Sequence, residues 1–195
     1  MAMLTREDLW SLEEYDRCRP EFRLQVMAHK KNRELVLGEN LRLTFEDRMT
    51  IQYQIQEMLR IEKVFDAAGI ADELAAYTPL IPDGDNWKAT LMLEYLDVGE
   101  RQSKVVELVG IENKVWLQVD GFAPVFPIAD EDLERRDTGR TSTVHFLRYQ
   151  LTPEQVQAVR RGAAIRAGMD HPRYVIDGQA VPEALRDSLR ADLAA

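Results

Sequence analysis

Two histidines and three glutamates are the residues of this sequence whose types fit metal chemistry. His145 lies in an alternating stretch that predicts a strand, and His171 follows a second predicted strand. Two histidines with one carboxylate form the ligand set of many non-haem iron sites. We therefore predict a transition-metal site for Fe, Mn or Zn. Its ligands would be Glu57 or Glu62 together with Glu94, His145 and His171.

Glu62 is the carboxylate that the sequence pattern places among apolar residues. It falls on the stripe of a predicted helix that also carries Leu59 and Phe65. A carboxylate buried in this way needs a cation, a hydrogen-bond donor or a proton. Glu57 and Glu62 stand about 140° apart around a helix, so the two do not easily bind one ion together.

The same residues also have a structural interpretation. The histidines would be hydrogen-bonded core residues, and the glutamates would pair with arginines such as Arg48, Arg60 and Arg148. A third interpretation is an enzyme that uses Glu62 and His145 for acid–base chemistry on an unnamed substrate. The spacing of the residues does not match a known ligand motif, so the three interpretations stay open.

Standard catalytic motifs are absent from the sequence. No two of the ten glycines are two residues apart, which excludes the glycine-rich dinucleotide fingerprint. No serine lies in a Gly-x-Ser-x-Gly elbow. The single cysteine, Cys18, excludes an internal disulfide and an iron–sulfur cluster held by cysteines of this chain alone. Whether the protein is an enzyme is therefore undecided by its motifs.

Helix and strand patterns alternate along the chain. Apolar and polar residues alternate from Trp87 to Tyr95, and residues 141–150 form a second predicted strand. The longest helix is predicted over 47–67 with Gly69 as its left-handed cap, and Pro20 is predicted to begin a separate helix. We expect an α+β fold, with a mostly antiparallel or mixed sheet of about six strands and helices packed on it.

The chain length favours one domain. A chain of 195 residues corresponds to about 1.3 average domains, so we predict a single domain over 1–195. The loop 78–86 is the best candidate for a break between domains. Because Leu80 and Ile81 make this loop apolar, we expect it to pack against a core inside the domain and not to act as a linker.

The charge of the chain restricts its partners. The formal net charge is −9 and the pI is near 4.9, which argues against binding to nucleic acid or to anionic lipid. No apolar run approaches the roughly 20 residues that cross a bilayer, and the first residues lack the apolar core of a signal peptide. We expect a cytoplasmic protein.

Six stretches of the chain resemble one bacterial family. They are Arg19–Arg23, Gln54–Met58, Leu80–Pro82, Ala89–Glu94, Val144–Arg148 and His171-Pro172-x-Tyr174. The family is catalogued as domain of unknown function 3501, and the resemblance covers essentially the whole chain. It implies a bacterial cytoplasmic protein, often encoded beside rubrerythrin-like and iron–sulfur oxidoreductase-like proteins. It assigns no catalytic residue.

Two functions follow as expectations. The first is an accessory protein of redox or oxidative-stress metabolism with the metal site described above. The alternative is a non-catalytic homodimeric interaction module that serves partner oxidoreductases, with rubrerythrin-like or iron–sulfur oxidoreductase-like proteins as those partners. Trp10, Trp87 and Trp116 fit the alternative, because large aromatic residues are enriched in protein interfaces.

Overall fold

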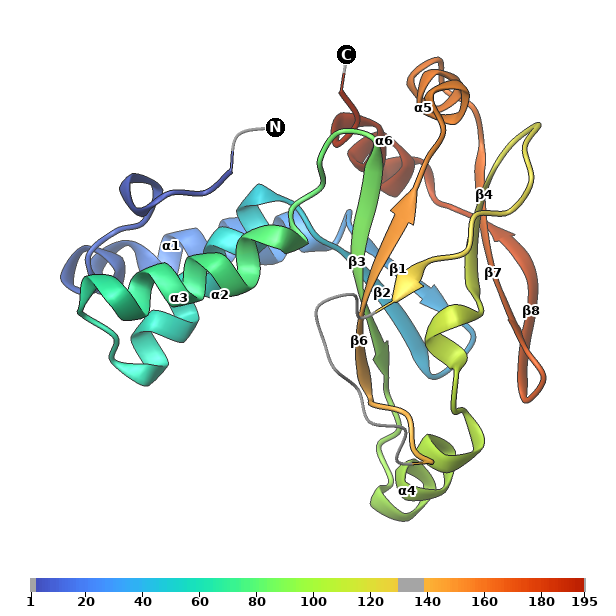
Figure 1. The fold of residues 1–195 in the computed structure, drawn as a ribbon, viewed down its shortest axis with the longest axis horizontal. Coiled ribbons are helices and arrows are strands. Elements are labelled where there is room, and N and C mark those ends of the chain that lie inside the picture. Colours follow the sequence, from blue (N-terminus) through green and yellow to red (C-terminus); the bar gives the residue numbers. More distant parts are fainter. Residues whose placement is uncertain (1–2, 130–138, 195) are drawn as a thin grey trace.

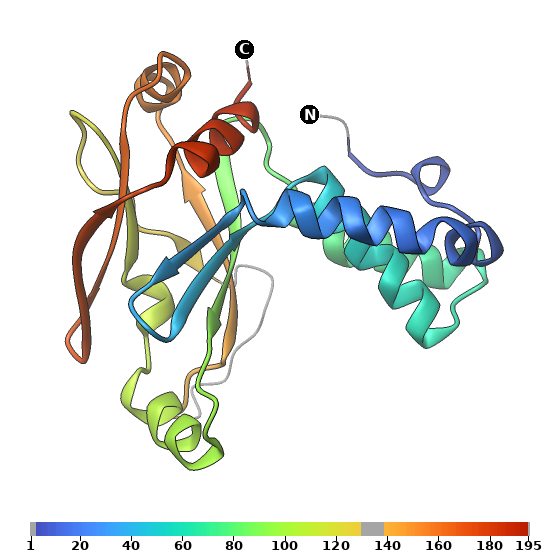
Figure 2. The same ribbon diagram turned by 180° about the vertical axis from the view of Figure 1, so that it is seen from behind.

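The structure has two regions, a helical arm and a body built on two β-sheets. It is a computed structural model that describes residues 3–129 and 139–194. The arm extends to one side of the body, as opposite views of the chain show (Figures 1 and 2).

The arm consists of three α-helices and two short 3-10 helices. They are η1 (Arg6–Asp8), α1 (Leu12–Lys30), α2 (Arg48–Glu62), α3 (Ala67–Tyr77) and η2 (Thr78–Leu80). Their apolar residues form two small clusters. Ile51, Ile55 and Leu59 belong to one of them, and Tyr15 and Phe22 belong to the other. The arm is therefore held together by the inner faces of its helices.

The prediction that Pro20 begins a helix is wrong. Pro20 lies inside α1, which begins after Ser11, whose hydroxyl accepts a hydrogen bond from the Glu14 N–H at 3.2 Å. A proline inside a helix removes one backbone hydrogen bond. Tyr15 and Phe22 are buried on either side of Pro20, and their packing supports the helix across it.

The prediction for the helix over 47–67 is also wrong, both in its end and in its rank, because α1 with 19 residues is longer than α2 with 15. α2 ends at Glu62, and Lys63 takes the left-handed conformation with φ 56°. Gly69 is not a left-handed cap. Instead it lies in the first turn of α3, where its N–H donates to Asp66 Oδ1 at 2.9 Å. The chain therefore turns several residues earlier than the sequence pattern predicts.

The body contains two antiparallel sheets. One has five strands in the order β1 (Glu34–Leu37), β2 (Leu41–Phe45), β3 (Asn86–Leu93), β6 (Val144–Gln150) and β5 (Ile128–Ala129). The other has three strands in the order β4 (Val115–Val119), β7 (Ile165–His171) and β8 (Tyr174–Ala180). The predicted α+β fold with antiparallel strands is confirmed, although its strands are divided between two sheets.

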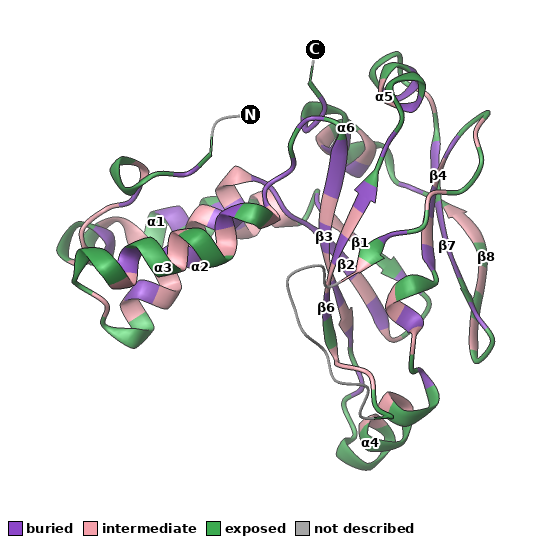
Figure 3. Cartoon of the chain, in the orientation of Figure 1, coloured by how far each residue is buried: buried purple, intermediate pink, exposed green. Residues whose placement is uncertain are grey.

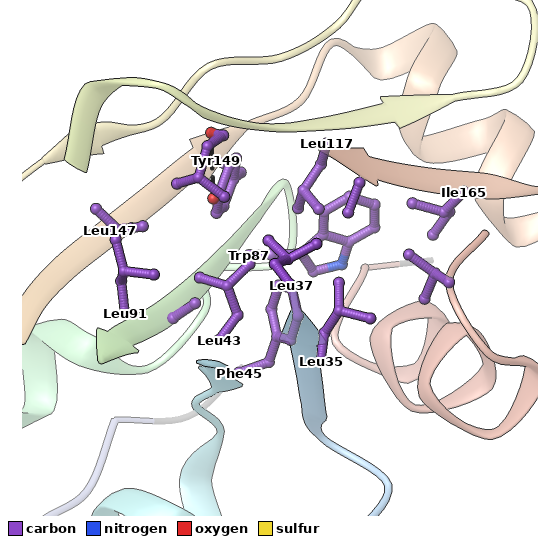
Figure 4. Packing of buried hydrophobic residues seen from close by; sticks show 14 of the residues in the cluster. Leu35, Leu37, Leu43, Phe45, Trp87, Leu91, Leu117, Leu147, Tyr149 and Ile165 are labelled. Atoms are coloured by element: carbon purple, nitrogen blue, oxygen red, sulfur yellow. Dashed lines mark hydrogen bonds between the residues drawn. The ribbon is translucent and has the colours of Figure 1, made fainter. Parts of the chain in front are cut away.

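The main hydrophobic core lies between the two sheets. Leu91 from the larger sheet and Leu117 from the smaller one belong to a single cluster of buried residues (Figure 4). Trp87 is 1% exposed, and its indole N–H donates to the carbonyl oxygen of Leu189 at 2.9 Å. This bond satisfies the one polar group of the buried indole and ties a body helix to the core.

Three helices complete the body within the described ranges. They are α4 (Val98–Glu107), α5 (Pro153–Arg160) and α6 (Glu183–Ala191), with the short 3-10 helix η3 (Ile111–Asn113) before β4. α5 begins at a capping box in which Thr152 and Gln155 exchange hydrogen bonds. In the described part of the chain, no helix is both long enough and apolar enough to cross a membrane.

The loop 78–86 leads from the arm to β3. Ile81 is 5% exposed and packs with Leu80 on the apolar cluster around Ile51. The apolar part of this loop thus packs on a cluster of the arm, and the expectation that the loop is internal to one domain and not a linker stays a prediction. The organisation of residues 1–195 as one domain stays a prediction.

Candidate functional site

The five predicted metal ligands lie on different elements. Glu57 and Glu62 are on α2, Glu94 follows β3, His145 is on β6 and His171 ends β7. Across residues 3–129 and 139–194, no three His, Cys, Asp or Glu side chains form a group that could hold a metal ion. The metal site stays a prediction, and the contacts of each residue show what else it does.

Glu57 is the centre of a charged network inside the arm. Its carboxylate accepts two hydrogen bonds from Arg19, at 2.7 and 2.9 Å, and one from the Tyr15 hydroxyl at 2.7 Å. Arg60 also donates to it at 3.2 Å. The bonds from Arg19 lower the pKa of Glu57 to about 2. The carboxylate of Glu57 is therefore ionised, and its hydrogen bonds to Tyr15 and Arg19 link α2 to α1.

The expectation that Glu62 is buried is wrong. Glu62 is exposed at the last position of α2, and Phe65 in the following turn is 70% exposed. The apolar stripe of the helix ends before these residues, because Lys63 turns the chain away from the inner face of the arm. Glu62 is therefore a surface charge at the end of α2.

Glu94 is also a surface charge. Arg42 donates to its carboxylate at 2.9 and 3.1 Å, and the same guanidinium donates to Glu34 at 2.8 Å. The Arg42 side chain is 31% exposed and the Glu94 side chain is 42% exposed. This ion-pair group links β1, β2 and the end of β3, which explains Glu94 without a ligand.

His145 is buried in the body, with 1% of its surface exposed. Its Nε2 atom lies 2.8 Å from the Thr141 hydroxyl, 3.0 Å from the carbonyl oxygen of Ser142 and 3.8 Å from Glu112 Oε2. Among the described residues, Glu112 is a carboxylate that these contacts bring near His145. Sequence patterns had not singled it out, because η3 lies far along the chain from β6.

His171 is the second buried histidine, with 6% exposed surface. Its Nε2 atom lies 3.3 Å from the carbonyl oxygen of Val109, and its Nδ1 atom accepts the backbone N–H of Arg173 at 3.2 Å. Both ring nitrogens therefore have backbone partners. Through these contacts the His171 side chain holds the turn between β7 and β8 against the residues that follow α4.

A buried polar network lies where the arm joins the body, and we call it the junction. Arg33 is 1% exposed and donates to Asp192 Oδ2 at 2.6 Å and to the Ser188 hydroxyl at 2.8 Å. It also donates to the carbonyl oxygens of Phe45 and Glu46 at 2.8 and 2.9 Å. One guanidinium thus connects the end of α1 to β2 and α6.

Two further acids belong to the junction. Asp47 Oδ2 lies 2.5 Å from His29 Nε2 and 3.4 Å from Arg33 Nη1. Glu46 is 5% exposed and accepts hydrogen bonds from the hydroxyls of Thr50 and Thr90, both at 2.6 Å. The junction therefore places two carboxylates, those of Asp47 and Asp192, beside one buried guanidinium, while hydroxyl groups hold the carboxylate of Glu46.

Burial controls the protonation of one acid in the junction. It raises the pKa of Asp192 to about 6, although the adjacent Arg33 favours the ionised form. A carboxyl group with this pKa can exchange a proton near neutral pH. No nucleophile or cavity accompanies it among the contacts described, so the arrangement supports the position of the arm better than a reaction.

A hollow of about 420 Å³ lies beside η2 on the outer side of β3 and β6. Lys88 and Arg148 stand opposite each other across these strands. Lys88 Nζ lies 3.1 Å from Asp83 Oδ2 and 2.5 Å from the carbonyl oxygen of Pro79, and Arg148 donates to Gln150 at 2.6 Å. Both cations already have partners within the chain, so the hollow shows no arrangement prepared for catalysis.

The comparisons with known proteins identify the family of this chain. The model of the family described as "Protein of unknown function (DUF3501)" matches residues 3–193. The chain belongs to the DUF3501 family. The family membership expected from its sequence stretches is confirmed. A search of curated proteins finds no match.

A solved structure is similar to this DUF3501 protein over almost its full length. It is the crystal structure of a novel protein of unknown function from Burkholderia pseudomallei K96243. The two chains share 48% sequence identity with a TM-score of 0.96, over 99% of this chain and 100% of the other. The arm and the body are therefore shared with a second protein whose function is not assigned.

The junction is the feature of this DUF3501 chain that sequence patterns missed. Asp47 followed by Thr50 is a capping-box pattern, and it could have placed Asp47 at a helix start. Nothing local indicates that Arg33 meets Asp192, which lies 159 residues away along the chain. Such a pair is visible only after the chain folds.

Proposed function

We propose that the chain is an accessory interaction protein whose arm docks on a partner protein. The observation that carries this proposal is the free end of the arm, where α2 turns into α3 (Figure 1). Two large apolar side chains are exposed there, Ile61 at 61% and Phe65 at 70%. An exposed aromatic residue at the end of a projecting element is the type of anchor that dominates interface energies.

Acidic groups near this end favour a partner with basic residues, although exposed Lys63 lies at the same turn. Glu62, Asp72 and Glu73 have no cation within ion-pair distance among the described residues. Burial, followed by the charges of Glu62 and Asp72, raises the pKa of Glu73. Its Oε2 atom is buried without a hydrogen-bond partner in the part of the chain that the structure describes. A partner with an apolar recess surrounded by Lys or Arg would complement both features.

Site-specific cross-linking tests the docking surface. Phe65 is replaced by a photoreactive phenylalanine analogue in the native host, and cross-linked proteins are identified by mass spectrometry. The matched control is the same replacement at Leu24, which is 71% exposed on α1. We expect one partner to cross-link at the first position and not at the second.

The identified partner is then purified and titrated with the full chain. Phe65→Ala should weaken binding about 30-fold, the effect of an interface anchor worth roughly 2 kcal/mol. Glu73→Gln should weaken binding less than Phe65→Ala does, and it should make binding less dependent on the salt concentration. Cross-linking equal at both positions, or binding unchanged by Phe65→Ala, would remove the free end of the arm as the docking surface.

A setting in redox or oxidative-stress metabolism is a further part of the proposal, and it is supported by the family resemblance. Rubrerythrin-like and iron–sulfur oxidoreductase-like proteins are accordingly the first partners to test. The transition-metal site is a separate part of the proposal, and it is supported by the approach of Glu112 to within 3.8 Å of buried His145. Metal analysis of the purified chain, with His145→Ala and His171→Ala as comparisons, tests it. Less than stoichiometric Fe, Mn or Zn after metal supplementation would dismiss the site.

A further inference from the structure

One ring nitrogen of the buried His145 is surrounded by oxygen atoms. Its Nε2 atom lies 2.8 Å from the Thr141 hydroxyl, 3.0 Å from the carbonyl oxygen of Ser142 and 3.8 Å from Glu112 Oε2. The Thr141 hydroxyl lies 3.4 Å from the same Glu112 oxygen. A ring nitrogen carries at most one proton, and neither a carbonyl nor a carboxylate group can donate one. Three oxygens gathered at one nitrogen therefore suit a cation held between them.

The spacing of these four atoms matches that of ligands on a single metal ion. Nitrogen and oxygen ligands lie about 2.0–2.2 Å from a bound transition-metal ion, so two ligands of one tetrahedral ion are about 3.4 Å apart. The contacts around His145 extend from 2.8 to 3.8 Å, on either side of this value. A proton on the ring nitrogen is shared with one or two of the oxygens, whereas a metal ion is held by all of them.

The backbone around His145 holds the donors in place. The N–H of Thr141 donates to the carbonyl oxygen of Val105 at 2.7 Å, which ties the segment before β6 to α4. The carbonyl oxygen of Thr143 accepts the N–H of Leu93 at 2.8 Å, which ties the same segment to β3. His145 follows at a buried position of β6. Donors fixed in this way by the fold lose little freedom when they bind an ion.

The carboxylate of Glu112 is oriented by its own element. Ile111 is 0% exposed and fixes η3 in the core, and Asn113 donates to Glu112 Oε1 at 3.2 Å. Among the described residues, no Lys or Arg lies within ion-pair distance of Glu112. Its side chain is 20% exposed, and α4, which precedes η3, has no buried residue (Figure 3). An ion can therefore reach this carboxylate from the solvent.

The types of the four donors select the ion. They are one imidazole nitrogen, one carboxylate oxygen and two neutral oxygens, and the single cysteine, Cys18, lies on α1 in the arm. Thiolate ligands favour zinc and copper(I), whereas carboxylate and carbonyl oxygens suit manganese. A set with three oxygens and no sulfur therefore fits Mn²⁺ best among the transition metals.

We infer that η3 and the start of β6 form a binding site for a divalent metal cation, with Mn²⁺ as the best match. Its donor atoms are His145 Nε2, Glu112 Oε2, Thr141 Oγ1 and the carbonyl oxygen of Ser142. The inference rests on the transition-metal part of the proposed function and deepens it, because it names three donors besides His145. It does not use His171, whose two ring nitrogens have backbone partners.

Titration of the metal-free full chain with Mn²⁺ tests these donors, with electron paramagnetic resonance measuring the free ion. The wild type should bind one Mn²⁺, and Glu112→Gln and His145→Ala should weaken binding at least about 10-fold. Thr141→Val should also weaken it, while Thr141→Ser keeps the hydroxyl and should bind as the wild type does. The matched controls, Glu107→Gln and Thr143→Val, should leave binding unchanged. Circular dichroism establishes that each variant is folded.

Paramagnetic broadening locates the ion among the three histidines of the chain. Mn²⁺ broadens the NMR signals of the nuclei nearest to it. Substoichiometric Mn²⁺ should therefore broaden the ring signals of His145 before those of His29 and His171. Earlier broadening at another histidine, or equal binding by Glu112→Gln and Glu107→Gln, would overturn this donor set and leave the proposed metal site to other residues. Absence of any bound Mn²⁺, Fe²⁺ or Zn²⁺ would overturn both, and neither result bears on the docking of the arm.

Discussion

The body and the arm bury their side chains in different ways. In the body, strands of two sheets and the helices α5 and α6 contribute to one continuous core. The arm divides its apolar residues between two smaller clusters. In the described chain, the four buried side-chain atoms without a hydrogen-bond partner also belong to the arm, on Gln56, Arg60, Glu73 and Thr78. The arm is therefore expected to open locally at a lower free energy than the body.

This difference suits an interaction protein. A rigid body can hold a projecting element, while the element itself can adjust when it meets a partner. The two regions are joined at the junction, where Arg33 connects α1 to β2 and α6. The stability of the arm relative to the body can therefore be changed at the junction, in the core of either region, and in the network around Glu57.

The largest expected effect comes from the junction. Arg33→Ala removes a buried cation and leaves Asp192 and two carbonyl oxygens without their donor, which should cost about 3–5 kcal/mol. Arg42→Ala is the control, because its pairs at the surface should contribute at most about 1 kcal/mol. Denaturant unfolding measures both. Equal losses from the two variants would show that the junction does not join the regions.

The second effect compares the two cores directly. Leu91 in the body and Ile55 in the arm are both 0% exposed, and replacing either by Ala should cost about 2–5 kcal/mol. Leu91→Ala should accelerate hydrogen exchange throughout the chain. Ile55→Ala should accelerate it in α1, α2 and α3 first. Exchange that rises together in both regions for Ile55→Ala would mean that the arm and the body unfold as one unit.

The third effect is acid sensitivity of the arm. The folded pKa of Glu57 is about 2, below its ordinary value of 4.5, so its stabilising contribution is present above pH 4.5 and is lost as the pH falls through 2. This contribution is on the order of 2–3 kcal/mol. Glu57→Gln should therefore remove most of the acid dependence of exchange in α1 and α2. An unchanged acid profile would contradict the assignment.

The smallest expected effect is the pH dependence that Asp192 gives to the junction. Its sign is opposite to that of Glu57, because the pKa of Asp192 is raised and that of Glu57 is lowered. The folded pKa of Asp192 is about 6, above its ordinary value of 3.8. Its protonated form therefore stabilises the fold below pH 3.8, and this contribution is lost as the pH rises through 6. Asp192→Asn should flatten the slope of the unfolding free energy between pH 4 and 6. A steeper pH dependence of the unfolding free energy in Asp192→Asn would contradict the sign expected for Asp192.

Local patterns account for the elements that were predicted well. Alternation from Trp87 to Leu93 identifies β3, because every second side chain of that strand is buried. The signal Thr152-Pro153 marks the start of α5, since a cap and a proline act within one turn. β8 was not predicted, because only some of its side chains alternate in burial. Its position depends on pairing with β7.

The predicted site residues show where local patterns stop. Periodicity correctly placed Glu57 on a helix, but its partner Arg19 comes from another helix. Periodicity also extended the apolar stripe to Glu62, whereas the left-handed turn at Lys63 ends it. His145 and His171 are both buried, yet they lie on strands of different sheets. Residue type and spacing alone could not reveal these separations.

The sequence by itself determined the α+β class, the antiparallel strands and the family, because these depend on local periodicity and on stretches of matching residues. Only the tertiary structure decided which charged groups meet. Arg33 and Asp192 approach to 2.6 Å from opposite parts of the chain, while Glu62 stays at the surface. The physical reason is that the partner of a buried charge is chosen by packing between distant elements, and no local pattern records that choice.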